Sequence, residues 1–232
     1  MKRLLLALSL CSVSVFAAAA DKPVVAVAEF KNESGAGWWS GGMGWDLAGM
    51  LSNELVATGS FNVVERSKLE NVLEEQNLMA SGRAKLSDAA KMGKLAGAQY
   101  LVMGTVTDYE ENTKDSGGGL SFAGVSVGGK SKSAYLAIDI RVVNTSTGQI
   151  EFVRTIEGTS KGGGMHVGYS GAVSGNAGGE SNTPAGKAIR GAVVMVSDYL
   201  NCVMVRKDSC VGKFDALEQH RRDKTKDSLK LD

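Results

Sequence analysis

Residues 134–156 read AYLAIDIRVVNTSTGQIEFVRTI and carry the strongest signal of the fold. Apolar and polar side chains alternate between residues 134 and 143, which is typical of a strand with one face in a core, because successive side chains of a strand point to opposite faces. The inward set is Leu136, Ile138, Ile140 and Val142. Thr147 and Gly148 predict a turn into a second strand over residues 150–156, so the two strands form a β-hairpin.

Strands and helices alternate on the N-terminal side of this hairpin. Apolar runs predict strands over residues 24–30 (VVAVAEF), 61–65 (FNVVE) and 100–107 (YLVMGTVT). Apolar residues at helical spacing predict helices over residues 47–56 and 87–96.

Two more helices complete the expected core. One begins at Ser67, where Glu70 completes a capping-box pattern, and its apolar stripe is Leu69, Val72, Leu73 and Leu78. The last core helix has Pro184 in its first turn and runs to about Leu200. This order of elements indicates an α/β or α+β domain, in which helices flank a sheet.

Two glycine-rich inserts interrupt the regular core, at about residues 108–133 and 157–180. Within the second insert, residues 163–175 (GGMHVGYSGAVSG) alternate between an apolar and a small or polar face, over about the length of a tilted membrane-spanning strand. A soluble edge strand explains the same pattern. The candidate membrane-facing side chains of both inserts are Leu120, Phe122, Val125, Val127, Met165, Val167, Tyr169 and Val173.

The N-terminal residues 1–20 predict a secretory signal peptide, because Lys2 and Arg3 precede an apolar run and a row of alanines. Cleavage after Ala20 would leave a main domain over residues 21–200 and a C-terminal helix or tail over residues 201–232. Cys11 offers lipoprotein processing as an alternative, although Leu10 is bulkier than that signal requires. We expect no membrane-spanning helix after the signal peptide, so any crossing would use strands in an outer membrane.

Five runs of sequence carry a resemblance to a known family. They are AVAEFKNESG from residue 26, FNVVERSKLENVLEEQNLMASG from residue 61, GAQYLVMGTVTDYE from residue 97, RVVNTSTGQI from residue 141 and SNTPAGKAIRGAV from residue 181. In this order they resemble the CsgG/HfaB family over nearly the whole mature chain. The resemblance implies a core on the periplasmic face of the outer membrane, in which each subunit donates two β-hairpins to one shared oligomeric β-barrel.

The number of strands that one chain can supply also indicates a barrel shared between several copies. Two hairpins supply only four strands, whereas the smallest membrane barrels need about eight, and an open sheet edge in lipid leaves backbone groups unpaired. Membrane insertion therefore requires a homo-oligomeric ring, and roughly nine subunits would match the about 36 strands of the largest barrels. The resemblance also implies a secreted protein substrate and periplasmic accessory factors as partners. The near-neutral balance of 26 basic and 25 acidic residues argues against nucleic acid.

The loop at residues 36–45 (AGWWSGGMGW) resembles the pore constriction of the family's channels. Its only large side chains are Trp38, Trp39 and Trp45, which either pack over the core or narrow a pore to an extended chain. The sequence departs from the family at residues 157–162 (EGTSKG), which are polar, so that the strand expected there is barely visible.

Two catalytic patterns occur in the first insert without the context that they need. Residues 124–131 (GVSVGGKS) match a phosphate-binding loop and residues 124–128 (GVSVG) a nucleophile elbow, but both motifs must run from a strand into a helix. Strand periodicity follows instead. His166 and His220 are isolated and do not make a zinc site with the cysteines. We therefore expect no enzyme, no catalytic or metal-binding residue and no cofactor.

Cys202 and Cys210 are the two cysteines that remain after signal removal. An even pair in an oxidising compartment favours a disulfide. The alternative is two thiols on one continuous helix, where eight residues separate the Cα atoms by about 12 Å, which is beyond bridging distance.

The leading functional hypothesis is an outer-membrane-associated secretion or assembly component that forms an oligomeric channel for curli-like fibre subunits or adhesins. The alternative is a periplasmic accessory or anchoring protein that binds a partner without forming a pore.

Overall fold

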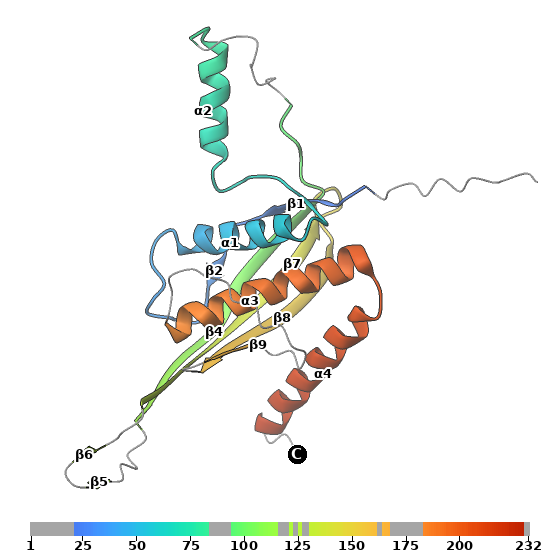
Figure 1. Cartoon of the computed structure of the whole chain (residues 1–232). Helices are drawn as coiled ribbons and strands as arrows, with labels where there is room; N and C mark the ends of the chain where they lie inside the picture. Colours follow the sequence, from blue (N-terminus) through green and yellow to red (C-terminus); the bar gives the residue numbers. More distant parts are fainter. Residues whose placement is uncertain are drawn as a thin grey trace, which may run out of the picture.

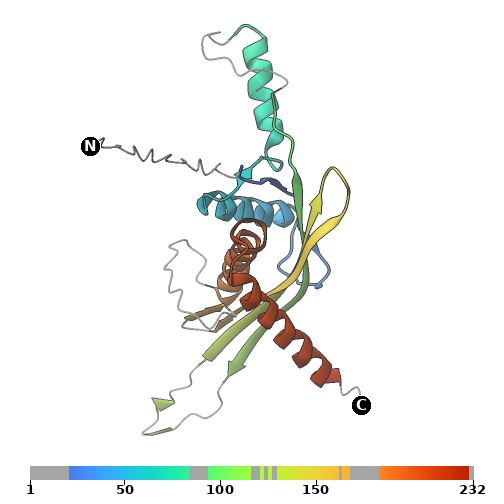
Figure 2. The same cartoon turned by 90° about the vertical axis from the view of Figure 1, so that its right-hand side faces the viewer.

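The computed structural model describes residues 21–83, 94–115, 121–122, 125–126, 130–161, 164–167 and 183–229. One mixed sheet of seven strands forms the centre of the fold, with helices packed on one of its faces (Figures 1 and 2). The sheet contains β1 (Val24–Val27), β2 (Lys31–Asn32), β3 (Asn62–Val63), β4 (Tyr100–Asp115), β7 (Lys130–Asn144), β8 (Ile150–Lys161) and β9 (Gly164–Val167).

The strand order is β3-β1-β4-β7-β8-β9, and β2 also pairs with β4. β1 runs parallel to β3 and β4, whereas β4, β7, β8 and β9 follow one another in antiparallel pairs. β5 (Ser121–Phe122) and β6 (Val125–Ser126) form a separate small hairpin. The predicted hairpin of residues 134–143 and 150–156 is confirmed, since these residues lie in β7 and β8 and Gly148 takes the left-handed conformation of the turn (φ 72°).

Helices α1 (Met43–Ala57) and α3 (Pro184–Leu200) cover one face of the sheet. The inward side chains that the alternation of β7 predicts, Leu136, Ile138, Ile140 and Val142, are all buried there. The core also takes Leu47, Leu51 and Leu55 from α1 and Val193, Val196 and Leu200 from α3. The expected fold class, a sheet flanked by helices, is confirmed.

The chain continues from α3 into a π-helical turn, η2 (Asn201–Arg206), and then into α4 (Cys210–Leu229). The stretch Pro184–Arg206 is long and apolar enough to cross a membrane, which differs from our expectation of no such helix. Because 67% of it is buried against the rest of the protein, it serves here as a core helix.

Helix α2 (Leu69–Ala80) departs from the prediction in two ways. The Glu65 carboxylate accepts hydrogen bonds from the Lys68 amide and the Ser67 hydroxyl just before the helix, and no side chain caps the first turn of α2, so the predicted capping box of Ser67 and Glu70 is wrong. No residue of α2 is buried by the described part of the chain, so none of the described residues covers its apolar stripe. The signal peptide and all but the end of the helix predicted over residues 87–96 lie outside the described residues; residues 94–96 have no regular structure.

Candidate functional site

Strands β4 and β7 continue past the core and project beyond the helices, whereas the ends of β8 and β9 lie beside α3 (Figure 1). β4 stays paired with β7 as far as Asp115 opposite Lys130, with one irregularity between Val106 and Asp108. The first insert therefore begins as an extension of two core strands, whereas the sequence predicted that these strands would end at residue 107 and begin at residue 134.

The second insert begins in the same way. β8 follows β7 as far as Lys161, and β9 pairs with residues 158–161. Residues 157–161 therefore form a strand although their polar sequence barely predicts one. β8 is still packed against α3 at Gly158, because a Cβ there would collide with the backbone carbonyl of Ala188, and Ser160 beyond it is also buried.

The projecting part of β4 is charged on both faces. Residues 108–115 read DYEENTKD, and the adjacent Glu110 and Glu111 point to opposite faces because side chains alternate along a strand. Across the ladder, Asp115 lies opposite Lys130. A charge on the lipid face of a barrel is destabilising, by about 2–4 kcal/mol for Arg or Lys at the midplane and less for Asp or Glu. This part of the ladder is therefore suited to water.

The loop after β2 brings two of the three predicted tryptophans to the base of the projecting strands. The Asn32 carboxamide oxygen accepts hydrogen bonds from the backbone amide and hydroxyl of Ser34, which turns the chain. Trp38 then stacks against Trp39 (ring centroids 5.5 Å apart) and meets Tyr109 of β4 edge-on at 5.2 Å. Both tryptophans are half-buried against the core.

Trp45 lies apart from this pair. It belongs to α1 and is 37% exposed on the side of the helix that faces away from the core. Trp38 and Trp39 thus form a loop packed on the core, and Trp45 is the most exposed of the three tryptophans.

Two tyrosines that the sequence analysis did not single out as site residues lie on the projecting strands. The Tyr109 hydroxyl donates a hydrogen bond to Glu111 (3.2 Å), and burial together with the Glu111 charge raises the pKa of Tyr109 to about 12. The Tyr135 hydroxyl donates to Glu157 of β8 (2.9 Å), and burial and that carboxylate raise the pKa of Tyr135 as well. Both phenols are neutral donors at ordinary pH, and the Tyr135 hydrogen bond links β7 to β8, whereas the Tyr109 hydrogen bond stays within β4.

The candidate membrane-facing residues fall into two groups. Phe122 and Val125 are paired across the β5–β6 hairpin, and Met165 and Val167 belong to β9. The others lie outside the described residues: Leu120, Val127, Tyr169 and Val173.

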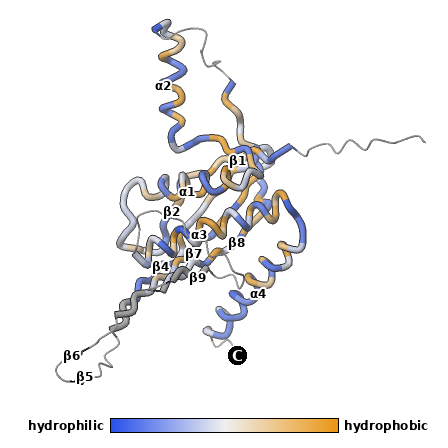
Figure 3. Tube along the Cα trace, viewed as in Figure 1, coloured by the Kyte–Doolittle hydropathy of each residue, from blue (hydrophilic) through white to orange (hydrophobic). Residues whose placement is uncertain are grey.

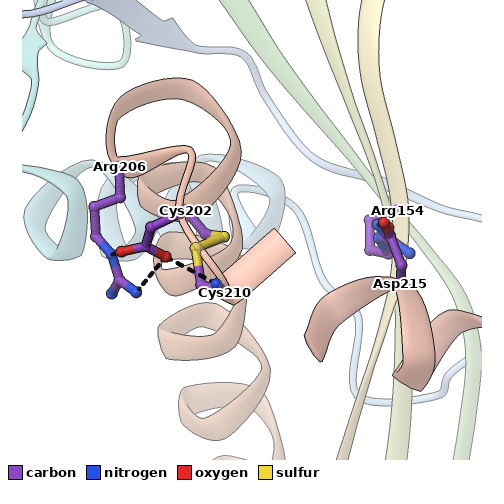
Figure 4. Close-up of a disulfide and its surroundings, with 6 residues drawn as sticks. Arg154, Cys202, Arg206, Cys210 and Asp215 are labelled. Atoms are coloured by element: carbon purple, nitrogen blue, oxygen red, sulfur yellow. Dashed lines mark hydrogen bonds and ion pairs between the residues drawn. A yellow bond between two sulfur atoms is a disulfide. The ribbon is translucent and has the colours of Figure 1, made fainter. Parts of the chain in front are cut away.

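Cys202 and Cys210 are joined by a disulfide, with Cα atoms 5.9 Å apart (Figure 4). The helix does not run on between them, because Lys207 takes a left-handed conformation (φ 50°) that reverses the chain. Asp208 stabilises the reversal by accepting hydrogen bonds from the Arg206 guanidinium and the Cys210 amide. These hydrogen bonds hold the pKa of the Asp208 carboxyl below its usual value.

Arg154 of β8 holds α4 against the edge of the sheet (Figure 4). Its guanidinium donates to the Phe214 carbonyl (3.2 Å) and to the Asp215 carboxylate (2.8 Å), and it lies 4.9 Å from the centre of the Tyr199 ring. Tyr199 also packs edge-on against Phe214 at 5.3 Å. No local sequence pattern marks Arg154, since its partners are more than forty residues away in the chain.

One group of potential metal ligands occurs among the described residues. In this part of the chain, only Cys202, Asp208 and Cys210 bring potential metal ligands together, and both sulfurs are committed to the disulfide. The two glycine-rich catalytic patterns lack their helix, because Ser131 lies within the β4–β7 ladder.

Comparison with known proteins gives one match over nearly the whole chain. Residues 7–229 match the family described as the curli production assembly/transport component CsgG. The protein of that description from Escherichia coli K12 is 30% identical over 105 residues, which cover 44% of this chain and 38% of that protein.

The chain also resembles a protein described as a lipoprotein and, with lower sequence identity, a protein of known structure. A protein described as a lipoprotein from Neisseria meningitidis serogroup B is 31% identical over 133 residues, which cover 55% of this chain and 54% of that protein. The matches thus span about half or less of both curated relatives. A solved hypothetical protein from Chlamydia trachomatis is 14% identical, with a TM-score of 0.41 over 78% of this chain and 98% of that one.

Proposed function

Because the chain belongs to the CsgG family, we propose that it is a subunit of an outer-membrane-associated ring that exports the subunits of an extracellular fibre or adhesin. The ring takes its strands from β4, β7, β8 and β9 of every copy. In this proposal the protein acts as a conduit and performs no chemistry on its cargo.

The observation that carries the proposal is a pair of free strand edges. Beyond Val106, β4 has no partner on its outer side among the described residues, and β9 has none on its outer side. Both edges lie at the same level, because β9 pairs with residues 158–161 and the ladder continues through β7 to β4 near Tyr109. A free edge is a template for pairing with another chain.

Strand direction allows the two edges to pair between copies. Four strands in antiparallel sequence make β9 run opposite to β4. The β9 edge of one copy can therefore form an ordinary antiparallel ladder with the β4 edge of the next, and repetition of this step closes a barrel without edges. A count of roughly nine copies follows only from the family resemblance.

The charged residues of β4 indicate which part of the projecting strands lies in water and which part enters the membrane. We propose that residues 108–115 and their partners form a water-exposed stalk below the membrane, and that the apolar candidates Leu120, Phe122, Val125 and Val127 beyond them meet lipid.

Electron microscopy and conductance of detergent-extracted protein test the proposal. We expect a ring with a central hole that conducts ions in a planar bilayer. Particles without a hole and without conductance would contradict it and would favour a periplasmic accessory protein that uses the same core to bind a partner.

A charge scan tests the strand placement separately. Val167→Arg, on the apolar parity of residues 163–175, should abolish assembly in the outer membrane, whereas Ser170→Arg on the other parity should be tolerated. Equal effects of the two substitutions would contradict a membrane strand.

We also propose that the mature chain begins at Asp21. The intact mass of membrane-extracted protein distinguishes this start from a lipidated Cys11.

A further inference from the structure

Helix α2 stands away from the sheet and from the other helices (Figures 1 and 2). At 100° per residue, Leu69, Val72, Leu73 and Met79 share one side of it, whereas Leu78 lies on the opposite side. Val72 and Leu73 are 37% and 42% exposed. Isolated helices of about twelve residues are marginal in water, so α2 needs a partner for this side. Figure 3 shows that apolar and polar residues both occur along it.

The outer side of α1 carries a hollow. The hollow has a volume of about 510 Å³, with Gly42 and Gly49 in its lining and Trp45 at one end. Val56, 58% exposed, continues the same side of the helix. Nothing lies within 4 Å of a Cβ built at Gly49, so the surface there is open to an approaching helix.

The dimensions of the two surfaces agree. The 12 residues of α2 span about 18 Å, and the side of α1 from Trp45 to Val56 spans about 17 Å, at 1.5 Å per residue. The chain cannot fill its own hollow in this conformation, because Ser67 and Lys68 form one wall of it and α2 leaves from that wall in another direction.

The acidic charge of α2 favours a protein partner over an anionic membrane surface. α2 carries Glu70, Glu74 and Glu75 and no basic residue, whereas helices that lie on anionic membranes are rich in Lys and Arg. The lining of the α1 hollow carries one positive and one negative side chain, Lys68 and Asp46, so the charge of α2 argues against an anionic membrane, and the fit to the hollow rests on its apolar side.

We infer that the apolar side of α2 docks into the α1 hollow of a neighbouring copy of this chain. The two surfaces differ, so the contact is head-to-tail, and repetition of such a contact closes a ring or extends a filament. The inference rests on the proposed assembly of several copies and assigns to it a contact outside the projecting strands.

Two substitutions and a control test this contact in the full chain. Leu73→Glu places a charge on the docking side of α2, Gly49→Glu fills the hollow, and Asn71→Glu adds the same charge on the far side of α2. We expect the first two to raise the apparent dissociation constant of the assembly in mild detergent at least about tenfold and the control to leave it unchanged. Because no residue of α2 is buried and Gly49 is open, circular dichroism and melting temperature should stay as in the wild type.

Mixing the two variants tests the pairing itself. The Leu73→Glu chain keeps an intact hollow and the Gly49→Glu chain keeps an intact helix. A labelled sample of one should therefore bind the other with about wild-type affinity, whereas each binds itself at least about tenfold more weakly. A Leu73→Glu chain that assembles as the wild type does, a wild-type chain that stays monomeric, or a mixture that does not bind would each overturn the inference. Rings that depend on Leu73 but conduct no ions would leave it standing and contradict the channel instead.

Discussion

The ring of Phe30 lies directly over Gly104, so closely that a Cβ at residue 104 would overlap with three ring atoms. Phe30 is buried at 3% exposure, at the break between β1 and β2, and Gly104 is in β4 at the level between the two strands' pairings. The absence of a side chain at Gly104 thus allows one phenyl ring to close the edge of the core where the sheet meets the tryptophan loop.

Gly104→Ala should destabilise the core. Adding a methyl group to a filled site costs about 1–3 kcal/mol, because the phenyl ring must move. Thermal unfolding measures the change. Gly212→Ala is the matched control, since a Cβ at Gly212 in α4 meets nothing within 4 Å. An unchanged melting temperature for Gly104→Ala would show that Phe30 has room to move.

Removal of the disulfide should destabilise the protein and loosen α4. The bridge closes a loop of sequence separation 8, for which the chain-entropy estimate is about 2–3 kcal/mol. Cys202→Ser with Cys210→Ser, measured by chemical denaturation, should match the wild type under a reductant. A wild type that is insensitive to the reductant would contradict a stabilising role of the bridge.

Substitution of Arg154 should reduce the stability of the protein more than substitution of its charged partner Asp215. Arg154→Met leaves the Phe214 carbonyl without its donor and removes the contact with Tyr199, at a cost of about 1.5–3 kcal/mol. Asp215→Asn removes only an exposed partner and should cost less than about 1 kcal/mol. Denaturant unfolding of both variants compares them. Equal costs would place the stabilisation in the ion pair alone.

Substitutions of the tryptophans should differ in their effect on the melting temperature. Trp38→Ala removes half-buried contacts with Trp39 and Tyr109 and should lower the melting temperature, whereas Trp45→Ala on the outer side of α1 should not. If Trp38 and Trp39 also narrow a pore, surviving rings of the Trp38→Ala and Trp39→Ala double variant should conduct more ions. Lower stability with unchanged conductance would limit their role to packing.

Tyr109 should make stability fall at high pH. Burial and the Glu111 charge raise the pKa of Tyr109 in the folded protein to about 12, above the ordinary tyrosine pKa of about 10. The contribution of Tyr109 to stability is therefore complete below about pH 10 and is lost as pH rises towards 12. Tyr109→Phe should reduce this loss, as followed by the free energy of unfolding between pH 9 and 12. Tyr100→Phe is the control, and an equal effect of both would contradict the assignment.

Local periodicity was sufficient for the regular core. The alternation of residues 134–143 predicted the buried face of β7, and Pro184 predicted the start of α3, because a strand or a helix shows its own repeat when one face is buried. The predicted capping box at α2 does not form, because the Ser67 hydroxyl donates to Glu65, which lies before the helix.

By itself, the sequence determined the α/β core, the family and the places where two inserts leave the core. Only the tertiary structure decided that these inserts begin as continuous strands, that α2 stays unpacked and that Arg154 holds α4. Residues 157–161 show no alternation of apolar side chains. They form a strand because their backbone pairs with β7 and β9, and such pairing cannot be recognised from the side chains. Contacts such as Arg154 with Phe214 depend on distant residues that only folding brings together.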